Sequence, residues 1–192
     1  MTNRIDCYIT AGGKATRMGG AIKAFVLIDG EKIIDRNIRT IKPAFQNISI
    51  ISNSPSSFDE YQKQGFIIIQ DVYKNIGPLA GLHTALANTK ADAVFLMASD
   101  MPYVDIKLIN EMIDVFQKND SEVLIPQYND RLEPLFAIYS KNILNKLELF
   151  INNIESRAMH KFIASFKITK FELNEDSIKS LYNLNNFSDI PK

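Results

Sequence analysis

The sequence predicts an α/β protein with a mostly parallel central sheet covered by helices on both faces. The first observation is alternation: short apolar runs of strand length are separated by segments whose apolar residues recur at helical spacing. The second is size and composition, because 192 residues, 46% of them hydrophobic, fit one domain with a core of its own. We therefore expect a single domain over residues 1–192.

The element order begins with a buried strand over residues 5–9, which leads into a glycine-rich loop. The dipeptide Asp29-Gly30 separates two short apolar runs, which predicts a hairpin. Apolar residues then recur at helical spacing up to Pro43, so a helix is expected over residues 34–44. A second strand follows at residues 48–52.

The remaining elements continue the same alternation. Further strands are expected over residues 66–69, 93–98, 123–125, 135–139 and 168–173. Further helices are expected over residues 58–64, 79–87, 105–118, 141–152 and 157–165. No internal repeat, low-complexity segment or linker interrupts this order.

The charge balance argues against a bulk electrostatic partner. Lys and Arg together number 22, and so do Asp and Glu, so the formal net charge is zero. Nucleic acid and anionic membranes are therefore not expected as partners, and any anion site must be local. No apolar stretch approaches the roughly 18 residues of a bilayer span, and no signal peptide is recognisable. We expect a cytoplasmic protein.

The few metal-ligating and thiol side chains give no basis for a structural zinc site or an intramolecular disulfide. Cys7 is the one cysteine, and its place in the first apolar run predicts a buried thiol. His83 and His160 are the only histidines and are far apart in sequence. We expect His160 on the surface of a helix.

The stretch from Thr10 to Lys23 carries the strongest chemical signal, and it reads Thr-Ala-Gly-Gly-Lys-Ala-Thr-Arg-Met-Gly-Gly-Ala-Ile-Lys. Glycine lets the backbone approach a ligand closely, and successive free N–H groups can form an anion site. Arg17 and Lys23 add positive charge. The stretch predicts a polyphosphate-binding loop, with a plain glycine-rich surface loop as the alternative. It matches neither a Walker A loop nor the Gly-x-Gly-x-x-Gly fingerprint.

Polar or conformationally permissive residues stand where four of the predicted strands end. They are Gly12-Gly13, Asn53, Asp71 and Asp100. In open α/β sheets, ligands bind beyond the carboxyl ends of the strands. We therefore expect these four positions to converge on one rim, which gives the glycine loop its structural context.

The pattern Ala-Gly-Gly-x-x-x-Arg-Met-Gly-Gly-x-x-Lys resembles that of the molybdenum cofactor guanylyltransferase family. Further segments similar to the family follow in order: Asn53, Asp71, Gly77–Leu82, Asp100-Met101-Pro102, Glu133–Tyr139, Glu155-Ser156-Arg157 and Asn183-Leu184-Asn185. The resemblance covers nearly the whole chain. It implies a three-layer, Rossmann-like nucleotidyltransferase fold, with a GTP-binding half over about residues 1–103 and a molybdopterin-side half over about residues 104–192.

The resemblance also implies the reaction, which is transfer of GMP from GTP to molybdopterin with release of pyrophosphate and with Mg²⁺ as cofactor. The catalytic residues it implies are Arg17, Lys23 and Asp100, with Asp100 as the metal ligand. The GTP-binding residues it implies are Thr10, Ala11, Gly12, Gly13, Lys23, Asn53, Asp71 and Asp100. Those on the molybdopterin side are Arg157, Asn183 and Asn185. Its expected partners are GTP, molybdopterin, and proteins that deliver molybdopterin or mature molybdoenzymes.

Two positions depart from the family's pattern. Ile22 stands where the family usually has Asp, which changes the charge of the loop, and Glu133 stands where it often has His, on the molybdopterin side. Two alternatives stay open. One is a cytidylyltransferase of the same cofactor or a sugar-phosphate nucleotidyltransferase, and the other is a non-catalytic nucleotide-binding protein. The doubled glycine at 19–20 and the Pro-Leu-Phe strand favour guanine.

Overall fold

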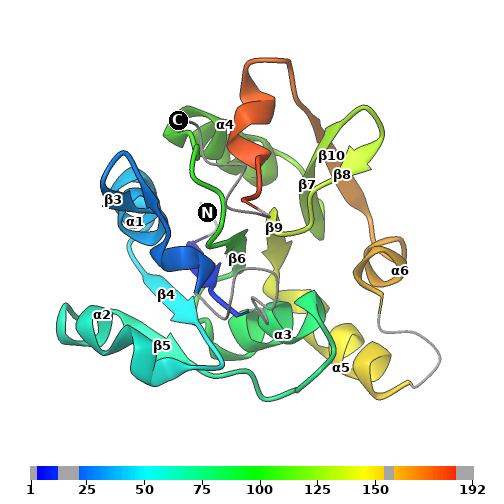
Figure 1. The fold of residues 1–192 in the computed structure, drawn as a ribbon. Coiled ribbons are helices and arrows are strands. Elements are labelled where there is room, and N and C mark those ends of the chain that lie inside the picture. The colour runs from blue at the N-terminus through cyan, green and yellow to red at the C-terminus, as the bar shows by residue number, and fades with distance from the viewer. Residues whose placement is uncertain (1–3, 13–21, 154–157, 185–192) are drawn as a thin grey trace.

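An eight-stranded sheet forms the middle layer of the protein (Figure 1). The computed structural model describes residues 4–12, 22–153 and 158–184. The strands are β1 (Ile5–Thr10), β4 (Ile48–Ile51), β5 (Ile67–Ile69), β6 (Ala93–Ala98), β7 (Val123–Tyr128), β8 (Arg131–Leu132), β9 (Phe136–Ser140) and β10 (Ile168–Glu172). Their order across the sheet is β10-β7-β9-β6-β1-β4-β5, and β8 pairs with β7.

The sheet is mostly parallel, as the sequence predicts. Strands β5, β4, β1 and β6 run side by side in the same direction, and β10 is parallel to β7. The exception in the main path is β9, which lies between β6 and β7 and is antiparallel to both. All six residues of β6 are buried, as expected for a central strand covered on both faces.

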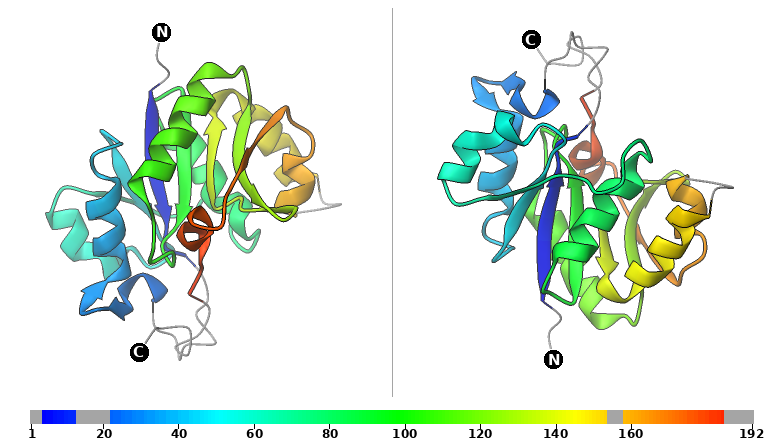
Figure 2. Two further views of the ribbon diagram at one scale, coloured as in Figure 1. Left: turned by 90° about the horizontal axis from the view of Figure 1, so that it is seen from above. Right: turned by 90° about the horizontal axis from the view of Figure 1, so that it is seen from below.

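Helices cover both faces of the sheet and complete a three-layer architecture (Figure 2). One face packs against α1 (Ile33–Ile41), α2 (Asp59–Lys63) and α4 (Ile106–Lys118), and the other against α3 (Pro78–Asn88), α5 (Leu144–Asn152) and α6 (Met159–Ile163). Alternation along β1 shows why both faces are apolar. Cys7 and Ile9 are buried in the core on the face that α1, α2 and α4 cover, and Tyr8 between them is buried in the core on the face that α3, α5 and α6 cover. The buried Cys7 confirms the predicted thiol.

The predicted hairpin forms, but it is shorter than its apolar runs. Strands β2 (Leu27–Ile28) and β3 (Glu31–Lys32) pair around Asp29 and Gly30, whose φ angles of 53° and 80° suit the type I′ turn that their sequence favours. The start of the first run instead forms a 3₁₀ turn, η2 (Lys23–Phe25), in which the N–H of Val26 donates to the carbonyl of Lys23. Apolar character alone did not separate this turn from a strand.

Some other boundaries also differ from the sequence-based expectation. Helix α1 ends at Ile41 rather than at residue 44, because the chain turns before Pro43. Strand β7 extends to Tyr128, and the two-residue strand β8 has no counterpart in the apolar pattern. Within the described ranges, no helix is both long and apolar enough to cross a bilayer.

Close packing of α3 on the end of β1 depends on two glycines. Helix α3 begins after Gly77, whose φ of 63° and ψ of −144° lie in a backbone region that residues other than glycine avoid. One turn later, a Cβ on Gly81 would lie only 2.8 Å from Cγ2 of Thr10. Thr10 cannot easily yield, because its hydroxyl donates to the carbonyl of Met97 at 3.1 Å. Gly81 therefore sets the distance between α3 and the start of the glycine loop.

We predict that Gly81→Ala destabilises the protein by about 1–3 kcal/mol, as overpacked core positions do. This is opposite in sign to the gain of about 1 kcal/mol that Gly→Ala gives in an unhindered helix. Urea unfolding measures the difference. The control is the double variant Thr10→Ser/Gly81→Ala, which lacks Cγ2 and should recover most of the loss. A single variant as stable as the wild type would contradict the close packing.

Candidate active site

The carboxyl ends of β1, β4, β5 and β6 line one cleft with a volume of about 1050 Å³. Seven of the residues that the sequence singles out lie along it: Thr10, Ala11, Gly12, Lys23, Asn53, Asp71 and Asp100. The predicted convergence of these strand ends on one rim is therefore confirmed for the residues that the structure describes. The cleft also includes Gly77 and Gly81 of the α3 amino end.

Backbone pairing continues past the end of β1 and places the first residues of the glycine loop. The N–H of Ala11 donates to the carbonyl of Ile51 at 2.8 Å, and the carbonyl of Thr10 accepts from the N–H of Ser99 at 3.0 Å. Gly12 follows directly, and a Cβ there would lie 3.5 Å from Nδ2 of Asn53. The neighbouring strands thus fix the chain up to the point where it meets the Asn53 side chain.

Lys23 and Asp100 form an ion pair in the cleft although they are far apart in sequence. Nζ of Lys23 donates to Oδ2 of Asp100 at 2.9 Å, and the two side chains are only 27% and 18% exposed. The main-chain carbonyl of Asp100 accepts from the N–H of Leu184 at 2.8 Å. Leu184 is itself fully buried against Val26 and Ile28 of the hairpin segment. Asp100 is therefore held through its side chain and its backbone at once.

Asn53 and Asp71 bond to each other across the ends of β4 and β5. Nδ2 of Asn53 donates to Oδ2 of Asp71 at 2.9 Å. The other oxygen of Asp71, Oδ1, accepts from the hydroxyl of Thr84 at 3.0 Å, and Thr84 is buried in α3. Each oxygen of this carboxylate thus has a donor of its own, and the three side chains form one network.

Glu133 brings the C-terminal part of the described chain to the same region. Its half-buried carboxylate accepts from the N–H of Leu135 at 3.3 Å and from the side chain of Asn183. Burial raises the pKa of Glu133 above its ordinary value, and the nearby negative charge of Asp100 raises it further. The side chain of Asn183, expected on the molybdopterin side, therefore lies beside the residue that stands where the family often has His, and its Nδ2 also donates to the carbonyl of Leu181 at 3.5 Å.

Ile22, the other departure from the family's pattern, has a packing role here. Its side chain lies against the core that contains α1 and α4, and it also lines the cleft. Four other predicted site residues, Gly13, Arg17, Arg157 and Asn185, lie outside the residues that the structure describes. His160 is exposed on α6, as expected.

Sequence reasoning missed three residues that shape this site: Thr84, Glu133 as a partner of Asn183, and Leu184 as a buried anchor. Thr84 looks like an ordinary helix residue, and Leu184 lies in what reads as a polar tail. The only signal was indirect, since Glu133 and Leu184 fall within the segments that resemble the family. Their contacts all join segments distant in sequence.

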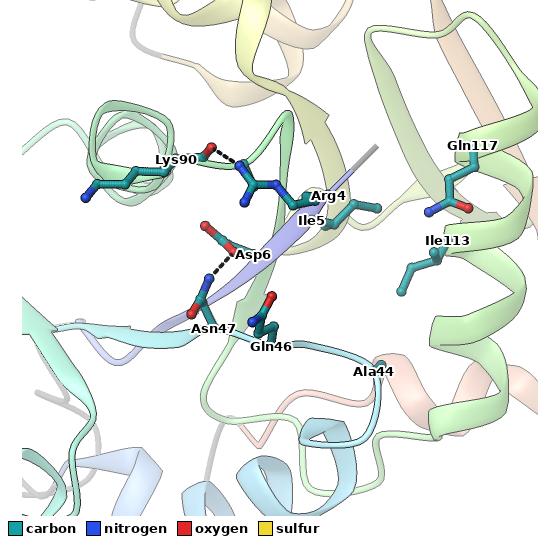
Figure 3. Close-up of a pocket in the computed structure, with 10 residues that line it drawn as sticks. Arg4, Ile5, Asp6, Ala44, Gln46, Asn47, Lys90, Ile113 and Gln117 are labelled. Carbon is teal, nitrogen blue, oxygen red and sulfur yellow. Dashed lines mark hydrogen bonds between the residues drawn. The ribbon is translucent and has the colours of Figure 1, made fainter. Parts of the chain in front are cut away.

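A second, smaller pocket of about 230 Å³ lies at the opposite edge of the sheet, around the amino end of β1 (Figure 3). Its polar groups bond to one another. Asp6 accepts from Nδ2 of Asn47 at 2.9 Å and from the hydroxyl of Thr89 at 2.7 Å, and Arg4 donates to the carbonyl of Lys90 at 2.9 Å. None of the sequence-predicted site residues lines it. The cleft at the carboxyl edge is therefore the candidate site.

Comparison with known proteins agrees with this location. The family model for the MobA-like NTP transferase domain matches residues 7–169, which defines the class as a nucleotidyltransferase. A probable molybdenum cofactor guanylyltransferase of Clostridium perfringens (strain 13 / Type A) is 36% identical over 183 residues, covering 92% of this chain and 89% of the relative. One from Natranaerobius thermophilus is 30% identical, covering 99% and 95%.

The chain belongs to the molybdenum cofactor guanylyltransferase family within the MobA-like NTP transferases. Among solved structures, molybdopterin-guanine dinucleotide biosynthesis protein A from Archaeoglobus fulgidus has the same fold, with a TM-score of 0.81. That likeness covers 96% of this chain and 94% of the other, at 22% identity. The predicted nucleotidyltransferase fold is confirmed.

The raised pKa of Glu133 predicts a pH-dependent effect on stability. A carboxyl whose pKa is higher in the folded than in the unfolded protein stabilises the fold only while it is protonated, and this contribution is lost as the pH rises through the folded pKa. Glu133→Gln stays neutral at every pH. Its free energy of unfolding, relative to the wild type, should therefore increase as the pH rises from about 4 to about 8.

Urea unfolding at several pH values measures this difference, with Glu172→Gln, at an exposed position of β10, as the control for loss of a carboxyl group. A difference between Glu133→Gln and the wild type that stays constant with pH, or shrinks as the pH rises, would contradict the predicted direction of the shift.

Proposed function

We propose that this protein transfers GMP from GTP to molybdopterin and releases pyrophosphate. The observation that carries the proposal is the shielded Lys23–Asp100 pair in the cleft, at the end of the glycine-rich stretch. It puts a cation and a candidate metal ligand where the sequence predicts a polyphosphate. The relatives named molybdenum cofactor guanylyltransferase support the choice of GTP and molybdopterin.

In this proposal the nucleoside lies along the strand ends. The backbone at Thr10, Ala11 and Gly12 approaches the nucleotide closely, and Asn53 and Asp71 contact the guanosine. Asn53 and Asp71 already face the cleft and bond to each other, which supports a shared role. Gly13 and Arg17 extend the triphosphate site by the same reasoning, with Arg17 adding a second cation.

The donor set fits Mg²⁺. Among the described residues there is no group of three or more His, Cys, Asp or Glu side chains able to hold a metal. Mg²⁺ does not require one, because it is commonly held by one or two carboxylates together with substrate phosphates and water. Asp100 supplies the carboxylate in the cleft. When bound, Mg²⁺ would neutralise charge on the phosphates.

The reaction calls for positioning and charge screening. The terminal phosphate of molybdopterin attacks the α-phosphorus of GTP, and the bond to pyrophosphate breaks. Both reactants are anionic, so fixed cations and correct placement lower the barrier more than a general base does. Lys23 neutralises the triphosphate and the leaving group. Asn183, next to Glu133, together with Arg157 and Asn185, holds molybdopterin.

We also propose the division of labour that the sequence predicts, with about residues 1–103 binding GTP and about residues 104–192 serving molybdopterin. Glu133, in the second half, is close enough to Asp100, in the first, to feel its charge, and Asn183 lies beside Glu133; this meeting of the two halves supports the division. Molybdopterin-delivering or molybdoenzyme-maturation proteins are proposed as further partners, and the cytoplasm, where GTP is available, as the location. The names of the relatives do not favour the cytidylyl, sugar-phosphate or non-catalytic alternatives.

We predict that Asp100→Ala lowers the rate of pyrophosphate release by about 10³-fold, in line with the loss of a key electrostatic group. Lys23→Ala should weaken GTP binding about tenfold, because it removes a partly shielded cation. Asp114→Asn, on the exposed side of α4, is the matched control and should leave activity unchanged.

The assay follows pyrophosphate with GTP, molybdopterin and Mg²⁺, and isothermal titration compares GTP with CTP. Near-normal activity of Asp100→Ala would contradict its role, and tighter binding of CTP than of GTP would overturn the guanylyl assignment.

A further inference from the structure

We propose that Thr84 is a positioning residue for base selection. Acting through Asp71, it fixes the Asn53 amide so that its carbonyl oxygen is the atom offered to the base. This inference rests on the proposed function, because it assumes that the nucleotide occupies the cleft at the strand ends. Thr84 is not among the site residues that the sequence predicts, and its contact with Asp71 gives a physical reason for a preference for guanine.

The three side chains come from three separate elements. Thr84 lies within α3 and is 1% exposed, Asp71 follows β5, and Asn53 follows β4. The hydroxyl of Thr84 and Nδ2 of Asn53 contact different oxygens of Asp71, at 3.0 and 2.9 Å. The carboxylate thus forms a bridge between the buried helix and the exposed amide, and the bridge and the amide both line the cleft.

The chemistry of the bridge fixes the direction of the amide. An ionised carboxylate has no proton to donate, so it accepts from both of its neighbours. Asn53 must therefore turn its NH₂ group toward Asp71, which leaves its carbonyl oxygen Oδ1 to accept a hydrogen bond from a ligand. A flipped amide would place two acceptors against each other and lose the bond. The orientation thus follows from the partner's chemistry.

Thr84 supplies the rigid end of the bridge. Strand β5 is the edge strand of the sheet, so the residue that follows it has a neighbouring strand on one side only. Asp71 is half-buried and Asn53 is exposed, whereas Thr84 is held within a helix whose residues from Leu79 to Leu86 are all buried. Without the Thr84 hydroxyl, Asp71 keeps Asn53 as its partner but loses the bond to the fixed helix.

A fixed acceptor favours guanine. Guanine carries N–H donors at both N1 and N2, whereas adenine N1 and cytosine N3 are acceptors on the corresponding edge. A site built to accept a hydrogen bond discriminates against bases that present another acceptor, because both groups then stay unpaired. An amide that rotates freely adapts to either pattern. Loosening the bridge should therefore reduce selectivity more than it reduces overall nucleotide affinity.

The test compares Thr84→Val, which keeps the size but removes the hydroxyl, with Thr84→Ser, which keeps the hydroxyl. Isothermal titration gives Kd for GTP, ATP, CTP and pyrophosphate. We expect Thr84→Val to weaken GTP binding about tenfold, in keeping with one lost hydrogen bond in a network. Affinities for ATP, CTP and pyrophosphate should change less than about twofold, and Thr84→Ser should stay close to the wild type on all four.

A double-mutant cycle tests whether Thr84 acts through Asn53. In an Asn53→Ala background, Thr84→Val should cause little further loss of GTP affinity, because the amide that it orients is absent. A second variant, Asp71→Asn, keeps the size of the bridge but allows either amide orientation. It should also reduce the preference of GTP over CTP, and it carries the test if Thr84→Val does not fold.

The outcomes separate this inference from the proposed function. If the wild type binds GTP no better than CTP, both fail. If the wild type prefers GTP and the two bridge variants keep that preference, only the inference fails. An equal loss for all three nucleotides would also overturn it, because Thr84 would then support the cleft or the ribose rather than select the base.

Discussion

The contact between Lys23 and Asp100 joins the parts of the molecule on which a nucleotidyl transfer site depends. Lys23 is the last residue of the glycine-rich stretch that follows β1, and Asp100 lies two residues after the end of the central strand β6. Because β1 and β6 are parallel neighbours, their carboxyl ends meet at one edge, and the ion pair forms across it. Leu184 adds a third segment by bonding to the backbone of Asp100. Cation, carboxylate and C-terminal segment are thereby held in one place before any substrate binds.

The other end of the cleft depends on a different kind of fixation. At the Asn53 end, the Asp71 carboxylate bonds both to the buried Thr84 of α3 and to the side-chain amide of Asn53, and so fixes the orientation of that amide. Gly81 allows the same helix to approach the end of β1 closely. One helix therefore positions both the start of the glycine-rich stretch and the group proposed to select the base. The Lys23–Asp100 contact and the Thr84–Asp71–Asn53 network share no side chain, so the proposed roles in charge neutralisation and in base selection can be tested separately.

The sequence predicted the architecture well because its signals are local. Apolar runs and helical spacing identify strands and helices, and strand ends in a parallel sheet must share an edge, so Asn53, Asp71 and Asp100 could be expected together. The antiparallel β9 was not predictable, because an apolar run such as Phe136–Tyr139 gives no strand direction. The contacts of Thr84, Glu133 and Leu184 were not predictable, because their partners Asp71, Asn183 and Asp100 lie in other segments of the chain. The roles of Gly13, Arg17, Arg157 and Asn185 rest on the family's pattern.

The most direct test of the central claim is a crystal structure of the protein with GTP and Mg²⁺. The account predicts guanine beside Asn53, the triphosphate beside Lys23 and the metal on Asp100, all within the cleft at the carboxyl edge of the sheet. A nucleotide bound at the opposite edge, in the pocket around Arg4 and Asn47, or a triphosphate away from Lys23 and Asp100, would contradict it.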